Sequence, residues 1–225
     1  MKRTFLPILA FVLLPVASFA ATEVDLKKTV EKIQANLDKV EDFSAKFTQL
    51  YHHKVLRKDD SSEGSVKFKK PGLMRWDYTK PSPKSFIVDG KALWVHQPSD
   101  KLAMVDRCFK QDTLTASLSF LWGGGNIEKQ FTYTPFKGNF GDATDINIQL
   151  TPKEKSRFYK RLVLVVDAKQ FQVKQSVVVD LEGNTNQFKF VDVKLNQGIK
   201  ATDFSFTPPK DTHVSNIPGS DEKCK

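Results

Sequence analysis

The chain has 225 residues, and its 35 lysines and arginines outnumber its 26 aspartates and glutamates, for a formal net charge of +9. This length excludes a minimal peptide scaffold and is sufficient for one domain with a substantial core. The basic balance is typical of a protein that meets nucleic acid, an anionic membrane surface or an acidic partner, although excess lysine can also serve only to solubilise the surface.

The N-terminus has the pattern of a secretory signal peptide. A basic start precedes an apolar run of about a dozen residues and a small-residue end at Ala20 and Ala21. The run is short for a membrane anchor, and two prolines interrupt it. We expect residues 1–20 to be cleaved, after Ala20 or Ala21, and residues 21–225 to form a single domain. Export disfavours nucleic acid as the partner of the basic surface.

Residues 22–42 show the periodicity of a helix. Apolar side chains recur three or four positions apart, at Leu26, Val30, Ile33, Leu37 and Val40. Thr22 with Asp25 resembles a capping pattern. The stripe is narrow, so the helix should pack on another element. From Phe43 the period changes to two, which predicts a strand through Phe47.

The stretch 64–98 carries the clearest strand signals. Met74, Trp76 and Tyr78 alternate with Arg75, Asp77 and Thr79, so an extended chain sends aromatic and charged side chains to opposite faces. The polar run 58–63 before it is expected to be a turn. Between two apolar runs, Asp89-Gly90 predicts a hairpin with a two-residue type I′ turn.

Residues 109–128 interrupt the strand pattern with a short apolar helix. Its side chains include Leu118, Phe120, Leu121 and Trp122, and three glycines at 123–125 end it. An apolar helix next to a glycine run can be a movable cover, and it can equally be an ordinary packing helix with a glycine stop.

Short alternating runs continue to residue 206 and bring the total to about eleven strands. After Phe188 and Phe190 the parity shifts to Val191 and Val193, which predicts a bulge and a bent strand. The fold class is therefore mainly β with some α: a closed or partly closed antiparallel barrel. Eighteen phenylalanines are a heavy apolar load, and they either fill the inside of the barrel or leave an apolar cavity.

The residue pattern favours binding over catalysis. The four histidines lack metal-ligand spacing, and no nucleophile motif or phosphate loop is present in the sequence. The pattern therefore predicts no enzyme activity, no cofactor and no metal. Cys108 and Cys224 either form one disulfide in an oxidising compartment or remain two unpaired thiols.

Four segments together resemble the periplasmic outer-membrane lipoprotein carrier family (LolA-like). They are F-S-A-K-F-T-Q at 43–49, G-S-V-K-F-K-K-P-G-L-M-R-W-D-Y at 64–78, V-D-G-K-A-L-W-V at 88–95 and F-S-F-T-P-P at 204–209. Each segment alone is weak, but their order and spread over the chain are fairly specific.

The resemblance implies an incomplete, half-open antiparallel β-barrel covered by the N-terminal helix and a central lid helix. It further implies a monomeric carrier in the periplasm of a Gram-negative bacterium, without catalysis. Its cargo is lipoproteins, held by their acyl chains, received from an inner-membrane ABC-type release complex and passed to an outer-membrane receptor. Two other readings remain: a carrier or sensor of another amphiphile such as a glycolipid, and an exported hydrolase.

By the same resemblance, apolar residues of the matched segments and of the central helix line the acyl-chain cavity. These candidates are Phe47, Met74, Trp76, Phe86, Trp94, Leu118, Phe120, Leu121 and Trp122. A basic edge of Lys69, Lys70 and Arg75 is expected to latch the lid and face the partners. The family usually has arginine where this chain has Lys70, and lysine lacks the planar five-donor fork.

Overall fold

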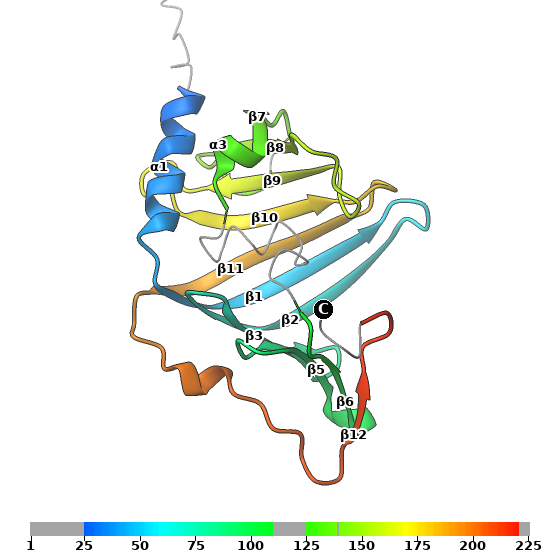
Figure 1. Ribbon diagram of the computed structural model, residues 1–225. Helices are drawn as coiled ribbons and strands as arrows, with labels where there is room; N and C mark the ends of the chain where they lie inside the picture. Colours follow the sequence, from blue (N-terminus) through cyan, green and yellow to red (C-terminus); the bar gives the residue numbers. More distant parts are fainter. Residues whose placement is uncertain (1–24, 110–124, 139, 221–225) are drawn as a thin grey trace, which may run out of the picture.

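The computed structural model describes residues 25–109, 125–138 and 140–220, and these form one open sheet of twelve strands (Figure 1). The strand order is β12-β6-β5-β4-β3-β2-β1-β11-β10-β9-β8-β7. The strands are β1 (Asp42–His53), β2 (Lys58–Lys69), β3 (Leu73–Lys80), β4 (Lys84–Val88), β5 (Leu93–Gln97), β6 (Leu102–Asp106), β7 (Phe131–Pro135), β8 (Ile146–Pro152), β9 (Arg161–Val166), β10 (Val173–Val179), β11 (Thr185–Leu195) and β12 (His213–Asn216).

The expectation of a mainly antiparallel, incompletely closed β structure is confirmed. Neighbouring strands pair antiparallel, except that β12 pairs with β6 in parallel. Sequence reasoning missed β12, because the segment from His213 to Asn216 is short and polar and becomes a strand only through its long-range partner. The predicted signal peptide and the predicted central helix at 118–122 lie outside the described residues.

The helix α1 (Leu26–Asp38) is shorter at both ends than the predicted range 22–42. It begins after Asp25, whose carboxylate accepts a hydrogen bond from the backbone N–H of Lys28 at 3.1 Å. It ends where the N–H of Val40 bonds back three residues to Leu37. The other described helical elements are α3 (Ile127–Gln130) and the 3₁₀ turns η1 (Pro98–Asp100) and η3 (Ala201–Phe204).

The two faces of the sheet carry different side chains. We call the face that α1 covers the inner face. Val30 and Ile33 of α1 are almost fully buried there, in an apolar cluster with Ile148, Leu164 and their neighbours on β7 to β10. Strand register continues this face onto β11, β1 and β3, where a second apolar cluster lies.

The C-terminal segment covers part of the opposite, outer face. After β11 the chain passes η3, where Phe204 is fully buried, and returns to the far edge as β12 (Figure 1). The ring of Phe206 lies 5.4 Å from that of Trp94 and 5.0 Å from that of His96, both on β5. The F-S-F-T-P-P segment is thus a packing segment of the outer face.

Two local predictions are wrong. Residues 58–63 are not a turn but the first half of β2, and the turn lies at 54–57. The hairpin at Asp89 has a four-residue loop, because Val88 pairs with Leu93. The carboxylate of Asp89 accepts bonds from the N–H groups of Lys91 and Ala92, at 2.8 and 2.9 Å, which stabilises this longer loop.

The bulge predicted after Phe190 is confirmed. Between Ser44 and Lys46 the register of β1 against β11 slips by one residue, and Asp192 has a φ of 54°. The extra residue in β11 explains the parity shift in the sequence.

None of the helices in the described ranges is long and apolar enough to cross a membrane.

Candidate ligand-binding site

The second inner cluster, which we call the aromatic wall, is built almost entirely from alternate residues of four strands. Its buried members are Phe43, Ala45, Phe47, Val66, Phe68, Met74, Trp76, Val88, Phe188 and Phe190. Cross-strand pairing explains why they meet, since Phe68 lies opposite Met74 and Val66 opposite Trp76. Phe47, Met74 and Trp76, predicted from the sequence, are thus brought together, each at most 3% exposed.

Phe47 lies at the centre of the wall. Its ring centroid is 4.7 Å from that of Trp76, 5.0 Å from Tyr78 and 6.0 Å from Phe188, all edge-on. Gly64 on the neighbouring strand makes room for it, because a Cβ there would lie 2.8 Å from the Phe47 ring and collide with the carbonyl oxygen of Asp77. Glycine at position 64 is therefore required by the close approach of the Asp77 backbone as well as by the Phe47 ring.

The wall ends in a half-buried rim formed by Tyr78, Lys84 and Phe86. Phe86 pairs with Trp76 across β3 and β4, so it belongs to the inner face, as predicted. The Lys84 ammonium lies 5.0 Å from the Tyr78 ring centroid and 5.1 Å from that of Phe86. Burial raises the pKa of Tyr78 to about 12, which marks the rim as an apolar environment.

Trp94 is separated from the other predicted wall residues. It pairs with Ile87 on the outer face, and its indole N–H donates to Asp89 at 3.1 Å. Its partner across the face is Phe206. We therefore leave Trp94 out of the wall. The other four candidates, Leu118, Phe120, Leu121 and Trp122, lie outside the described residues.

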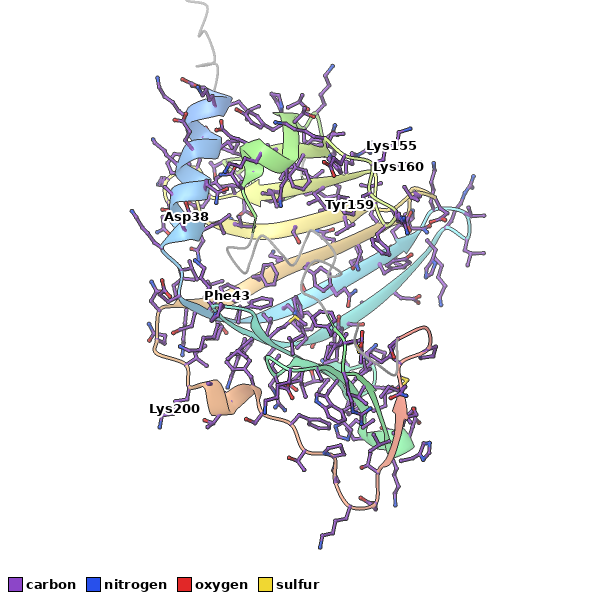
Figure 2. The ribbon with its side chains drawn as sticks, in the orientation of Figure 1. Asp38, Phe43, Lys155, Tyr159, Lys160 and Lys200 are labelled. Carbon is purple, nitrogen blue, oxygen red and sulfur yellow. The ribbon has the colours of Figure 1, made fainter. Side chains whose placement is uncertain are left out.

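A pocket of about 310 Å³ opens where the wall meets the cluster under α1. It is lined by the end of α1 and the start of β1, by the turn before β10 and by the end of β11: Asn36, Leu37, Lys39, Val40, Phe43, Gln170, Phe171, Gln172, Val173, Leu195 and Asn196. Figure 2 labels Asp38 at the end of α1 and Phe43 at the start of β1, the two elements that border the pocket on this side. This volume lies at the small end of the range for ligand pockets.

Sequence reasoning missed several of these residues. Phe188 and Phe190 had a signal, because their alternation matches that of Phe47 on the paired strand. Phe171 was missed because it occupies a turn, with a φ of 55°. The Lys32 ammonium lies 4.4 Å from the centroid of its ring.

Lys70 ties α1 to the sheet beside the pocket. Its ammonium donates to the carbonyl oxygens of Leu37, at 3.2 Å, and Asp38, at 3.0 Å, in the last turn of α1. A cation at this end of a helix also interacts favourably with the helix dipole. The described contact of Lys70 is therefore with α1.

Replacing Lys70 by methionine should loosen α1. We expect the free energy of unfolding to fall by about 1–2 kcal/mol, because two charge-assisted hydrogen bonds and the dipole interaction are lost. Amide hydrogen exchange in residues 34–40 should accelerate. Lys70→Arg, which keeps the charge and the donors, is the control and should exchange like the wild type. Unchanged exchange in Lys70→Met would contradict this role.

The other two residues of the predicted basic edge do not join Lys70. By strand alternation Lys69 and Arg75 lie on the outer face. The Arg75 guanidinium donates to Asp77 at 2.8 Å, and Asp77 also accepts from the Ser85 hydroxyl at 2.7 Å. Lys70 and Arg75 therefore lie too differently on the sheet to form one shared latch.

Cys108 is a disulfide cysteine in the structure. The only other cysteine of the chain is Cys224, which lies outside the described residues. The pairing of the two stays a prediction.

Comparison with known proteins decides the family. The family model for LolA, the outer membrane lipoprotein carrier protein, matches residues 38–207. The chain belongs to the LolA family. The LolA family is named for lipoprotein carriage, so the carrier function inferred from the four segments is confirmed at the level of the family.

Individual relatives of the LolA family match over most of their length. The outer-membrane lipoprotein carrier protein of Dechloromonas aromatica is 26% identical over 205 residues, 91% of this chain and 92% of the relative. That of Pseudomonas paraeruginosa is 25% identical over 190 residues, 84% and 88% of the two chains. An uncharacterized conserved protein from Thermus thermophilus shares the fold, with a TM-score of 0.53 at 12% identity over 85% of this chain and 99% of that one.

Proposed function

We propose that this protein carries lipoproteins through the periplasm by holding their acyl chains against the aromatic wall and in the adjoining pocket. The observation that carries the proposal is the apolar cluster of the aromatic wall on the inner face, with a pocket of about 310 Å³ at its end. Each acyl methylene removed from water stabilises the complex by about 0.8 kcal/mol, so a long chain suffices for tight binding.

Trp76 supplies a polar anchor in this wall. Its indole nitrogen is buried and finds no hydrogen-bond partner in the part of the chain that the structure describes. A buried donor without a partner is costly. An ester or amide carbonyl at the head of an acyl chain offers the missing acceptor, which suits a lipid-modified protein better than a plain hydrocarbon.

The proposal includes the rest of the carrier cycle. The exported chain, residues 21–225, acts as a monomeric domain, receives cargo from an inner-membrane ABC-type release complex and passes it to an outer-membrane receptor. In this proposal the cargo is held and not cleaved, because the side chains of the aromatic wall are aromatic and aliphatic and suited to holding a chain.

Mass spectrometry of ligand extracted from protein purified from the periplasm tests this function. We expect lipoproteins with acylated N-termini to be recovered with the wild type and to be lost when the wall is disrupted. Recovery of a glycolipid instead would show that the same wall serves another amphiphile. Release of cleaved lipid products would contradict a carrier and support a hydrolase.

A further inference from the structure

The hairpin that joins β1 and β2 ends in two exposed aliphatic side chains. Val55 is 83% exposed and Leu56 is 70% exposed, the highest values among the large apolar residues that are exposed in the described chain. Twelve-residue strands carry this turn well beyond the apolar inner clusters (Figure 1). Neither side chain takes part in those clusters, so their exposure needs another explanation.

Two neighbouring loops place further exposed apolar side chains at the same end of the sheet. The turn between β10 and β11 carries Leu181, 44% exposed, and meets the hairpin where the N–H of Lys54 donates to Asn184 at 3.0 Å. The loop before β9 carries Phe158, which is 61% exposed. The backbone N–H of Lys160 in this loop donates to the carbonyl oxygen of Val179 at the end of β10, at 2.8 Å. We call Val55, Leu56, Phe158 and Leu181 the apolar tip.

Basic side chains surround the apolar tip. Lys54 and Arg57 flank the aliphatic pair in the sequence. The loop before β9 adds Arg157 together with Lys155 and Lys160, the two that Figure 2 labels. These five basic side chains form no ion pair with any described residue. Two acids of the same loops, Glu154 and Glu182, likewise form no ion pair with a described residue.

The other acidic groups near the tip already have partners. Asp59 bonds to His52 at 2.6 Å, and Asp60 bonds to His53 at 2.9 Å and to Lys58 at 2.8 Å. Asp180 accepts bonds from the N–H groups of its own turn. These partners leave the carboxylates charged, so the cations of these loops outnumber the acids only slightly. The five basic side chains outside ion pairs are nevertheless available to meet an anionic partner.

We propose that the apolar tip and its basic surround dock the protein onto the surface of an anionic phospholipid bilayer. Exposed aliphatic and aromatic side chains next to lysine and arginine match a membrane interface, where the apolar groups enter the acyl boundary and the cations meet the headgroups. A protein partner fits less well, because four exposed side chains on three short connections offer little of the roughly 800 Å² per side that a stable protein interface buries. The proposal does not depend on what the aromatic wall binds.

Co-sedimentation with lipid vesicles tests the proposal. The purified protein should sediment with vesicles of phosphatidylglycerol and phosphatidylethanolamine and much less with pure phosphatidylcholine. The double variant Val55→Asp, Leu56→Asp should bind the anionic vesicles at least 10-fold more weakly. The variant Lys54→Glu, Arg57→Glu should lose the preference for anionic lipid.

The control is a matched double change at exposed valines elsewhere, Val191→Asp and Val214→Asp, each 41% exposed. This control should sediment with the vesicles like the wild type. The tip variants should bind a lipidated peptide as tightly as the wild type does, and this result would separate membrane docking from the carrier function. Failure of the wild type to bind anionic vesicles would overturn the proposal in favour of a protein partner. Equal sedimentation of the tip variant and the wild type would overturn it as well.

Discussion

Replacing Phe86 by glutamate should weaken acyl-chain binding at least 100-fold, about 2.7 kcal/mol, while the fold persists. Phe86 lies at the half-buried rim, opposite Trp76 and beside Tyr78, with ring centroids of Tyr78 and Phe86 5.8 Å apart. A carboxylate on this apolar face has to be desolvated whenever an acyl chain covers it. Binding of a fluorescent dipalmitoyl lipopeptide measures the loss.

The fold tolerates this change because a compensating charge is already present. The Lys84 ammonium lies 5.1 Å from the Phe86 ring centroid and can pair with the new carboxylate. We expect the free energy of unfolding to fall by only about 1–2 kcal/mol. Circular dichroism and urea unfolding establish that the variant is folded before its binding is measured.

A matched control separates the wall from general effects of charge. Val191 is 41% exposed and pairs with Lys46 on the outer face, so Val191→Glu also introduces a carboxylate beside a lysine. This variant should bind the lipopeptide like the wild type. If Phe86→Glu bound as tightly as Val191→Glu, the aromatic wall would not be the acyl-chain site.

The alternation of residues 73–80 was enough to predict which side chains of β3 belong to the wall. Period two places Met74 and Trp76 on one face and Arg75 on the other, and the structure agrees. The same rule excludes Trp94. Two-residue and four-residue hairpin loops both keep Trp94 off the face of Phe86, because both loop lengths preserve the parity of the paired strands. That prediction was wrong for a reason already present in the sequence.

Other features depend on contacts between distant segments and have no local signal. Residues 58–63 look like a turn because they are polar, yet they form a strand because β1 pairs with them along its whole length. The ion pair of Glu63 with Lys80, at 2.9 Å, is one of the interactions that favour a polar strand there. The pocket likewise needs Phe171, a turn residue that meets Leu37 only once α1 lies on the sheet.

Asp42 should be the polar side chain whose loss most destabilises the protein. It is 2% exposed, and its carboxylate accepts hydrogen bonds from the N–H groups of Gln197, Gly198 and Ile199, at 2.7, 2.8 and 3.1 Å. Asp42→Ala leaves three backbone donors without this acceptor and removes a set of charge-assisted bonds. We expect a loss of roughly 3–5 kcal/mol, a large part of the stability of a typical domain.

Urea unfolding measures this loss, and Asp211→Ala is its control. Asp211 lies in the C-terminal segment that Asp42 anchors, but it forms only an exposed pair with Lys101, at 3.1 Å, so its removal should cost less than about 1 kcal/mol. Asp42→Asn keeps one acceptor oxygen and should fall between the two. Equal stability of Asp42→Ala and Asp211→Ala would rule out the anchoring role of Asp42.

The position of Asp42 also predicts where Asp42→Ala unfolds first. The loop that it holds connects β11 to η3, and Asn196 at the start of this loop lines the pocket and accepts a bond from the N–H of Glu41 at 2.7 Å. Amide exchange in residues 196–206 should therefore accelerate more than exchange in β8 and β9. Because the same loop borders the pocket, lipopeptide binding should weaken together with the protection of these amides, whereas Phe86→Glu should weaken binding and leave that protection intact.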